Sequence, residues 1–374
     1  MLYAFELSGE HQSLPVAEVL GTLTSRNLNY TVFAEYKQCL VADIFSETRS
    51  DNDIFQTLKD DISKVLAMSH TIFQVIDIVD VSEDDVLGLA ENFPLDNYLK
   101  PGQTFVVRAK RMGDGTLLKS VDIEGRIGGR IFRRGFRADL SRPDVVFRLT
   151  LTDKAVFGVL VSAVDRGSYE HRSPQRKPFF YPGVLMPRVA RALVNMAGVK
   201  ENTIVVDPFC GTAGILMEAG LLGAKVFGVD AQEKIIEGAG MNMAGYSITG
   251  ELLSKEEREK NQNESGPASC GRMDYELLAG DACRLPFKNE IADAIVTDPP
   301  YGRSAAIKAE SLEGLYEKSF LEMYRILKKN GKAVVVSEIE VEKFAKNAGF
   351  EIQKTYKQRV HRSLTRTMTV LEKK

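Results

Sequence analysis

Residues 203–230 read TIVVDPFCGTAGILMEAGLLGAKVFGVD, and this stretch decides the fold of the C-terminal half. A short β-branched run, TIVVD (203–207), predicts a strand, and a glycine-containing turn separates it from the helical sequence ILMEAGLLG. A second apolar run, KVFGVD (225–230), predicts the next strand. Strands separated by helices are typical of a parallel sheet covered by helices, so the stretch predicts an α/β fold.

The same alternation extends on both sides of this stretch. Helices are expected at 185–197, 232–244 and 312–328, and further strands at 275–281, 292–298 and 332–338. The end of the chain, residues 350–373, offers two strands without a helix between them, which predicts an antiparallel hairpin at the sheet edge. Residues 251–274 are rich in Asn, Ser, Gly, Pro and Glu, and they predict a mobile loop insertion.

The N-terminal half has a different organisation. Over residues 1–80 the expected order is strand, helix, two strands, helix, strand, with boundaries at 2–8, 14–27, 29–44, 53–70 and 71–80. This βαββαβ order is typical of a ferredoxin-like unit. Residues 81–165 predict a second α+β unit, which begins with a helix capped by Ser82. Residues 166–182, rich in Pro, Arg and aromatic side chains, predict a linker.

Charge is distributed unevenly along the chain. Residues 1–100 hold 6 Lys and Arg against 17 Asp and Glu, whereas residues 101–200 hold 19 against 8. A basic middle third favours binding of a polyanion such as RNA, although a solvated basic face that pairs with the acidic first hundred residues is the alternative. The candidate RNA-binding residues are Arg126, Arg130, Arg133, Arg134 and Arg137.

Composition excludes several classes of protein. No apolar run approaches the length of a membrane span, and the start, MLYAFELSGEH, lacks the layout of a signal peptide, so we expect a cytoplasmic protein without a membrane partner. The scattered cysteines argue against a zinc site and against a disulfide framework, and no metal is expected. They are Cys39, Cys210, Cys270 and Cys283. We expect the chain to act as a monomer.

Acidic residues and glycines stand at the ends of successive strands of the α/β half, where open sheets of this class bind ligands. Glycines in the 207–214 turn let the backbone approach a ligand closely. Asp230 is placed to accept from ribose hydroxyls and Asp281 from an adenine amino group, although each acid alone could simply cap a helix. The predicted cofactor-binding residues are Asp207, Phe209, Gly211, Thr212, Gly214, Asp230, Asp281 and Ala282.

The fourth strand of this half ends in the sequence DPPYG at 298–302. Two successive prolines hold the backbone in a rigid extended turn, which fixes a carboxylate, a carbonyl and an aromatic ring in a small space. An exocyclic amino group presents two hydrogens and a planar ring, so Asp298 and the Pro299 carbonyl can accept the hydrogens while Tyr301 stacks. These three residues are the predicted catalytic residues, and a rigid surface turn is the alternative.

These motifs resemble known families. DPFCGTAG (207–214), VD (229–230), GDA (280–282) and DPPYG resemble the signature of class I amino-group methyltransferases. Residues 135–161, GFRADLSRPDVVFRLTLTDKAVFGVLV, resemble the end of a THUMP domain. Residues 176–199, RKPFFYPGVLMPRVARALVNMAGV, resemble the linker and first helix of the archaeal tRNA (guanine(10)-N2)-dimethyltransferases.

The resemblance implies a Rossmann-like class I methyltransferase domain at 183–374, with a mostly parallel sheet and a C-terminal antiparallel hairpin. It implies that a ferredoxin-like unit (1–80), a THUMP domain (81–165) and the linker precede this domain. S-adenosyl-L-methionine is the implied cofactor and tRNA the implied partner. The implied reaction is mono- and dimethylation of the exocyclic N2 of guanine 10.

Two other functions remain open. The target can be another amino group of an RNA base, such as adenine N6 or a different tRNA or rRNA guanine, because DPPY is shared with DNA adenine and protein glutamine methyltransferases. A noncatalytic RNA-binding protein is the second, which the intact glycines and acids at the strand ends disfavour. A dehydrogenase is less favoured than either, since the glycine spacing is not G-x-G-x-x-G.

Overall fold

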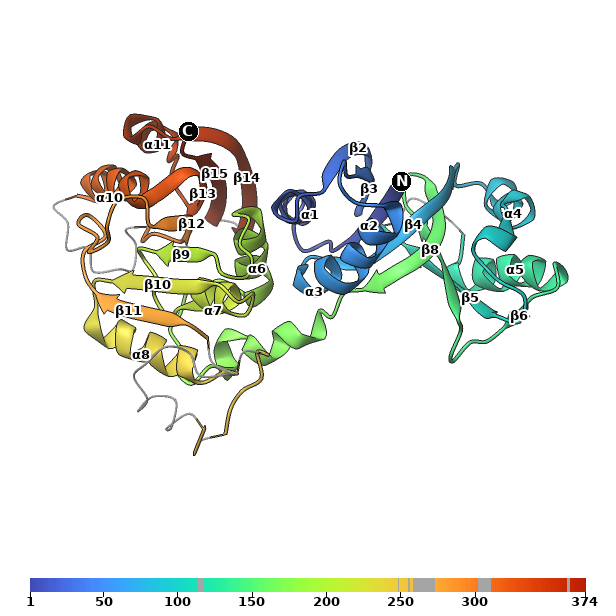
Figure 1. The fold of residues 1–374 in the computed structure, drawn as a ribbon, viewed down its shortest axis with the longest axis horizontal. Helices are drawn as coiled ribbons and strands as arrows, with labels where there is room; N and C mark the ends of the chain where they lie inside the picture. The colour runs from blue at the N-terminus through green and yellow to red at the C-terminus, as the bar shows by residue number, and fades with distance from the viewer. Residues whose placement is uncertain (114–117, 248, 255, 258–272, 302–310, 362–363) are drawn as a thin grey trace. The chain divides into compact units, whose positions relative to one another are not determined.

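The computed structural model describes residues 1–113, 118–247, 249–254, 256–257, 273–301, 311–361 and 364–374. The predicted loop insertion at 251–274 therefore lies largely outside the described residues, as does Gly302. The chain forms two compact units (Figure 1). The N-terminal unit contains residues 1–10, 26–64 and 69–165, and the C-terminal unit contains residues 11–25, 65–68 and 166–374.

The N-terminal unit is built on one eight-stranded sheet with the order β2-β3-β1-β4-β8-β7-β5-β6 (Figure 1). Its strands are β1 (Leu2–Leu7), β2 (Asn29–Tyr36), β3 (Cys39–Phe45), β4 (Ser69–Val79), β5 (Thr104–Arg111), β6 (Arg137–Ala138), β7 (Val145–Leu151) and β8 (Ala155–Ala163). β4 pairs antiparallel with β8 from Thr71 opposite Ala163 to Val79 opposite Ala155. Residues 1–80 and 81–165 therefore contribute four strands each to a single continuous sheet.

The helices of this unit include the two that the sequence predicted, one of them shorter than expected. They are α2 (Asp51–Thr57), a π-helical turn (Leu58–Ile62), α3 (Ser63–Val65), α4 (Glu83–Asn92), a 3₁₀ turn (Leu95–Asn97) and α5 (Ser120–Arg133). The helix expected over 53–70 ends at Val65, because β4 already begins at Ser69. Ser82 caps α4 as predicted, since its hydroxyl accepts the N–H of Asp85.

Helix α1 (Leu14–Ser25) belongs to the C-terminal unit although its flanking strands do not. It packs on α6 (Pro187–Met196), and Gly21 permits the close approach, because a Cβ there would lie 2.9 Å from Met196 Cα. Glu18 is fully buried in this contact, and its carboxylate accepts the N–H groups of Ala67 (2.7 Å) and Met68 (2.8 Å). Burial raises the pKa of Glu18 to about 7.

The C-terminal unit is built on a seven-stranded sheet with the order β11-β10-β9-β12-β13-β15-β14. Its strands are β9 (Ile204–Asp207), β10 (Lys225–Asp230), β11 (Tyr275–Ala279), β12 (Ala292–Thr297), β13 (Leu327–Ser337), β14 (Glu351–His361) and β15 (Leu364–Glu372). The strands from β11 to β13 run parallel, and β15 is antiparallel to both β13 and β14. The predicted hairpin is thus present, with β14 at the edge.

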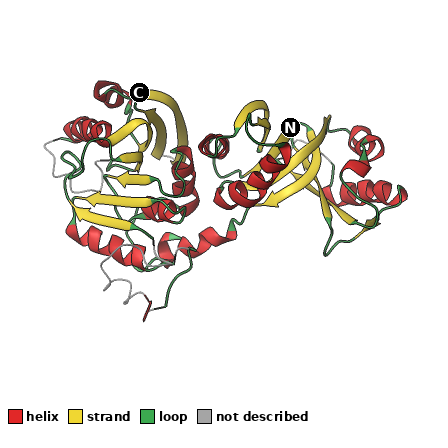
Figure 2. Ribbon diagram, in the orientation of Figure 1, coloured by secondary structure: helices red, strands yellow, loops and turns green. Residues whose placement is uncertain are grey.

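Helices cover both faces of this sheet (Figure 2). They are α6, α7 (Gly214–Gly220), α8 (Glu233–Ala244), α10 (Leu312–Ile326) and α11 (Glu342–Ala348). Successive strand residues point to opposite faces, so Val205 packs in the core with α6, α7 and α8, and Val206 packs in the core with α10 and α11. The α/β class predicted from residues 203–230 is confirmed. Within the described residues no helix has the length and apolar character needed to cross a bilayer.

Candidate active site

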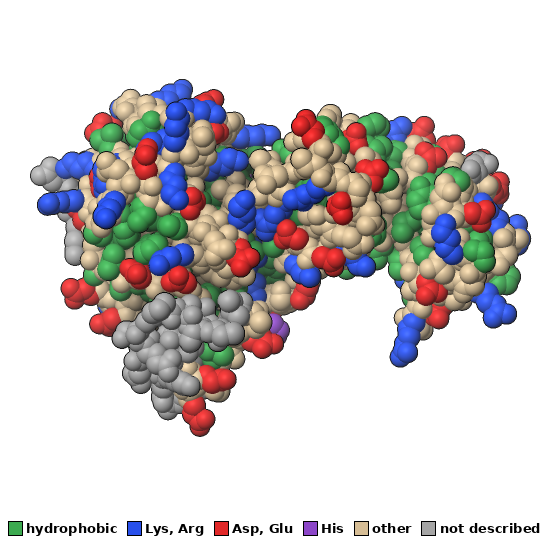
Figure 3. Space-filling model, viewed as in Figure 1, with side chains coloured by type: hydrophobic (Ala, Val, Ile, Leu, Met, Phe, Trp, Pro, Cys, Tyr) green, Lys and Arg blue, Asp and Glu red, His purple; other side chains and the backbone are tan. Residues whose placement is uncertain are grey.

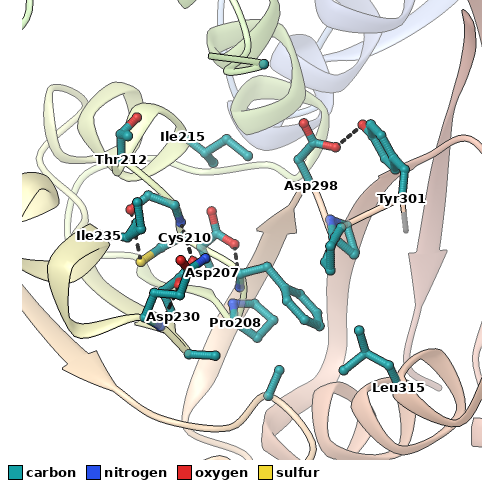
Figure 4. Close-up of a pocket in the computed structure, with 18 of the residues that line it drawn as sticks. Asp207, Pro208, Cys210, Thr212, Ile215, Asp230, Ile235, Asp298, Tyr301 and Leu315 are labelled. Carbon is teal, nitrogen blue, oxygen red and sulfur yellow. Dashed lines mark hydrogen bonds between the residues drawn. The ribbon is translucent and has the colours of Figure 1, made fainter. Parts of the chain in front are cut away.

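A cavity of about 780 Å³ opens at the carboxyl ends of β9, β10, β11 and β12, entirely within the C-terminal unit (Figure 4). Every residue predicted as catalytic or cofactor-binding lines this cavity. They are Asp207, Phe209, Gly211, Thr212, Gly214, Asp230, Asp281, Ala282, Asp298, Pro299 and Tyr301. The structure therefore brings together motifs that are separated by about ninety residues of sequence, because parallel strands end at one edge of the sheet.

Backbone amides fix the acidic side chains at one end of the cavity. The carboxylate of Asp230 accepts the N–H of Gly211 (3.2 Å) and the N–H of Gln232 (3.0 Å). Asp281 accepts the N–H of Cys283 at 2.8 Å. Gly211 adopts a positive φ of 49°, a conformation that glycine permits at little cost. The turn between β9 and α7 is thereby tied to the end of β10.

Asp207 has a different environment from the other two acids, because it is only 1% exposed. Its carboxylate accepts the hydroxyl of Thr297 at 2.6 Å and the N–H of Phe209 at 3.1 Å. Burial raises the pKa of Asp207 to about 7, although both hydrogen bonds oppose the rise. Asp207 thus connects the turn after β9 with the end of β12. The contact with Thr297 was not predicted from sequence.

At the other end of the cavity, Asp298 and Tyr301 point toward one another (Figure 4). The Tyr301 hydroxyl donates a hydrogen bond to Oδ1 of Asp298, a contact that the sequence did not predict. Burial raises the pKa of Asp298 to about 6, while the hydrogen bond from Tyr301 and the charge of Arg366 oppose the rise and the charge of Glu338 adds to it. Burial also raises the pKa of Tyr301, so its hydroxyl stays protonated.

The cavity is also lined by residues to which the sequence prediction gave no catalytic or cofactor-binding role. They are Tyr181, Pro182, Gly183, Val184, Leu185, Pro208, Cys210, Ile215, Ala231, Gln232, Ile235, Gly280, Cys283, Pro300, Ser311, Gly314, Leu315, Lys318, Glu338 and Arg366. The guanidinium carbon of Arg366 lies 5.7 Å from the centre of the Tyr301 ring, and its Nη2 donates to the Gly183 carbonyl at 3.4 Å. Arg366 comes from β15. In the sequence it stands out only as a cation in a strand where polar and apolar residues alternate.

The segment predicted as a linker, residues 166–182, is part of the C-terminal unit. It forms two 3₁₀ turns, Gly167–Arg172 and Pro174–Arg176. The side chain of Asn242 accepts the N–H of Phe179 at 2.9 Å and donates to its carbonyl at 3.0 Å. A Cβ at Gly238 would lie 2.2 Å from the Phe179 ring, so the glycine makes room for this side chain. These contacts hold residues 181–185 at the wall of the cavity.

A buried ion cluster anchors the same segment. Glu218 on α7 is 1% exposed and pairs with Arg172 at 2.8 Å and with Arg191 of α6 at 2.9 Å. The Arg172 guanidinium also lies 4.6 Å from the centre of the buried Tyr169 ring. Basic residues of the linker therefore do not all lie on its surface, and Arg172 contributes to packing instead.

The five predicted RNA-binding arginines lie on or near α5 in the N-terminal unit. Arg126 pairs with Glu83 at 2.6 Å and Arg130 with Glu91 at 2.8 Å, both across to α4. Arg134 donates to carbonyls at the end of α4, and Arg133 and Arg137 are exposed. On the face shown in Figure 3, basic side chains over this region are interspersed with acidic ones. Part of the basic middle third thus pairs with the acidic first hundred residues.

Comparison with known proteins matches both halves of the chain. Residues 174–368 match the family model of the RMKL-like methyltransferase domain, and residues 81–159 match the THUMP domain model. The crystal structure of TrmN from Thermus thermophilus covers 100% of both chains with a TM-score of 0.50 at 21% identity, which indicates a shared fold.

Curated relatives match over the full length. The tRNA (guanine(10)-N2)-dimethyltransferase of Methanothermobacter thermautotrophicus is 32% identical over 98% of this chain and 98% of its own. The enzyme of the same name from Methanocaldococcus jannaschii is 28% identical over 100% of both chains. With the cavity at the strand ends and the methyltransferase and THUMP models both matched, the chain belongs to the tRNA (guanine(10)-N2)-dimethyltransferase family of RMKL-like methyltransferases.

Proposed function

We propose that this protein is an S-adenosylmethionine-dependent tRNA methyltransferase that adds one and then a second methyl group to the exocyclic N2 of guanine 10. The observation that carries the proposal is the juxtaposition of Asp298, Pro299 and Tyr301 with the turn after β9 in one cavity. The relative that is 32% identical over nearly the whole chain supports the choice of base and position.

The cavity fits the cofactor. Its volume of about 780 Å³ lies in the range of sites for small molecules and cofactors, which is roughly 300–1,000 Å³. We assign Asp230 to the ribose hydroxyls, Asp281 and Ala282 to the adenine, and the remaining predicted residues of the 207–214 turn to the methionine end. The apolar side chains of Ile215 and Ile235 line the same region (Figure 4). S-adenosylmethionine supplies a methyl group on a positively charged sulfur.

The other end of the cavity fits a base with an exocyclic amine. A guanine must leave its helix to reach the site, as bases modified on their edges do. We assign Tyr301 to stack on its ring and Asp298 with the Pro299 carbonyl to accept the amino hydrogens. Because Tyr301 binds Oδ1 of Asp298, Oδ2 is the oxygen assigned to the amine. Accepting these hydrogens directs the nitrogen lone pair, which is otherwise delocalised into the ring.

The N-terminal half serves RNA binding in this proposal. We assign residues 1–80 to a ferredoxin-like unit, 81–165 to the THUMP domain, 166–182 to the linker and 183–374 to the methyltransferase domain. The five arginines on or near α5 supply charge for tRNA phosphates. The enzyme acts in the cytoplasm as a monomer, and size-exclusion chromatography with light scattering tests the oligomeric state.

The test of the proposal is tritium transfer from labelled S-adenosylmethionine to unmodified tRNA transcripts. We expect label on a transcript with guanine 10 and none above background when this base is adenine. Asp298→Ala abolishes the transfer, while the matched control Glu317→Ala, on the exposed side of α10, leaves it unchanged. Digestion to nucleosides then separates mono- from dimethylated guanosine.

Each alternative gives a distinct result. Transfer that survives the change of guanine 10 places the target at another base. Binding of tRNA without transfer to any RNA contradicts an enzyme and supports a noncatalytic RNA-binding protein. Transfer that survives Asp298→Ala removes this residue from the proposed site.

A further inference from the structure

The groups at the end of β12 explain how an amine is held but not how guanine is chosen. Adenine and guanine both carry an exocyclic amine and a ring on which an aromatic side chain can stack. Guanine differs because it presents O6 and N7 as two neighbouring acceptors, whereas adenine presents a donor and an acceptor. A hydrogen-bond donor placed at the O6 and N7 edge would therefore distinguish guanine from adenine.

Arg366 is a donor in that position. It lines the cavity, its guanidinium lies 5.7 Å from the centre of the Tyr301 ring, and its charge acts on Asp298. Among the described residues, its Nε is a buried nitrogen without a hydrogen-bond partner. The other buried side-chain atoms in this condition, on His11, Ser69, Thr71 and Thr355, belong to residues that do not line the cavity. A buried donor without a partner is costly, so the Arg366 guanidinium gains from a rearrangement that brings its Nε to an acceptor.

The hairpin fixes Arg366 at this place. Thr367 pairs with Ser337 of β13, and Val335 of the same strand pairs with Thr297 of β12, so Arg366 reaches the sheet edge where Asp298 follows β12. The hydroxyls of Ser337 and Thr367 lie 2.8 Å apart, and the Thr367 hydroxyl donates to the Ser337 carbonyl at 3.1 Å. The Gly183 carbonyl accepts from Nη2 on the other side. The backbone of Arg366 is thus fixed by the pairing of β15 with β13, and its guanidinium is held by the Gly183 carbonyl.

We propose that Arg366 is a specificity-determining residue that donates hydrogen bonds to the O6 and N7 edge of the target guanine. This assignment rests on the proposed function. A planar guanidinium matches these two acceptors, whereas an adenine whose only exocyclic amine is held at Asp298 has no O6 to accept from it. A base with its amine at Asp298 and its ring beside Tyr301 occupies the cavity that Arg366 also lines, with the guanidinium 5.7 Å from the centre of the Tyr301 ring.

The experiment compares two tRNA substrates with three enzymes. One tRNA carries guanine at position 10, and the other carries 2-aminopurine, which keeps the 2-amino group but lacks O6. We measure kcat/KM for wild type, Arg366→Gln and the control Lys343→Gln, which removes an exposed cation that pairs with Glu313 on the surface. Removal of O6 should lower kcat/KM of wild type and of the control by about 10- to 100-fold. Arg366→Gln should be slower on guanine by a similar factor and should show little further reduction on 2-aminopurine.

The ratio of the two reductions separates the hydrogen bond from other effects, because any change in the intrinsic reactivity of the amine is the same for every enzyme. If removal of O6 lowers kcat/KM of Arg366→Gln by the same factor as it lowers that of wild type, Arg366 does not bind O6. The effect of the substitution then reflects a general electrostatic role or a phosphate contact. Cofactor binding and thermal unfolding of the variant verify its fold. Arg366→Lys, which keeps the charge but not the planar donors, should show the same reduced sensitivity to O6 and replaces Arg366→Gln if that variant is unstable.

Failure of this inference is distinct from failure of the proposed function. Absence of transfer by wild type to guanine 10 contradicts the function itself. If wild type methylates guanine 10 but the reductions in kcat/KM from O6 removal and from Arg366→Gln are independent, only the role of Arg366 is contradicted.

Discussion

Asp298 combines two properties that determine when the site can work, namely its position at the end of β12 and its raised pKa. An ionised carboxylate accepts the hydrogens of an amine, whereas a protonated one presents a donor and loses that capacity. A pKa of about 6 leaves most of the carboxylate ionised at neutral pH. The sequence identified this residue and its neighbour Tyr301 from two neighbouring prolines, but the charge of Arg366, which comes from β15, depends on tertiary structure and gave no local signal.

The first prediction concerns the pH dependence of catalysis. Because protonation of Asp298 removes an acceptor, kcat/KM should be retained above the pKa and fall as pH drops through about 6. Tyr301→Phe removes a hydrogen bond that lowers this pKa, so the acid limb should move to higher pH. The profile is measured as kcat/KM from about pH 5 to about pH 9, a range that spans the titration of Asp298.

Tyr324→Phe, which alters a tyrosine outside the cavity, serves as the control and should keep the wild-type profile. A limb that stays in place in Tyr301→Phe assigns the titration to another group. Asp207, whose pKa is raised to about 7 without a hydrogen bond from Tyr301, is then the candidate.

At the scale of elements, local patterns predicted most strands and helices. The alternation of TIVVD and KVFGVD, the Ser82 cap and the closely spaced final strands all correspond to observed elements. The predicted helix at 53–70 was too long, since its last two residues belong to β4, where Ser69 pairs with Leu7 of β1. The packing of elements could not be predicted from local patterns. The buried partners of Glu218, for example, are Arg172 and Arg191, and no sequence periodicity relates these positions.

The second prediction concerns this ion cluster. Glu218→Ala leaves two buried guanidiniums without their carboxylate, and this should lower the free energy of unfolding of the C-terminal unit by about 3–5 kcal/mol. Glu237→Ala, an exposed glutamate on α8, is the matched control and should change it by less than about 0.5 kcal/mol. Urea denaturation monitored by circular dichroism measures both. Equal stability of the two variants would show that the cluster relaxes at no cost.

At the scale of the whole molecule, the sequence predicted α+β units in the N-terminal half and an α/β fold in the C-terminal half. The α/β assignment is confirmed. The sequence did not predict that residues 1–80 and 81–165 share one sheet, because the pairing of β4 with β8 joins strands that are far apart in sequence. Nor did net charge by segment predict which cations are paired. Arg126 and Arg130 form ion pairs with α4, whereas the side chains of Arg133 and Arg137 are exposed to solvent.

The third prediction follows from this difference. Replacing Arg133 and Arg137 by Gln should weaken tRNA binding and reduce the slope of log Kd against log salt by about 1 for each phosphate that the variant no longer neutralises. Arg126→Gln should have a smaller effect, because Glu83 already neutralises that cation. Filter binding over a series of salt concentrations gives the slopes. An unchanged slope in the double variant would place the phosphate-binding residues elsewhere on the protein.

The division of the chain between its units has a consequence for biosynthesis. Residues 11–25 and 65–68 belong with the C-terminal unit, yet they emerge from the ribosome before most of the N-terminal sheet. The apolar face of α1 therefore stays uncovered until α6 has been translated. The carboxylate of Glu18 likewise lacks the hydrogen bond that the side chain of Asn195, on α6, donates to it at 2.9 Å in the folded protein. A gene fragment that starts at residue 166 encodes the complete cavity but not the helix that covers α6. Residues 166–374 alone therefore do not form the complete C-terminal unit. A fusion of this half to another RNA-binding domain must also include α1.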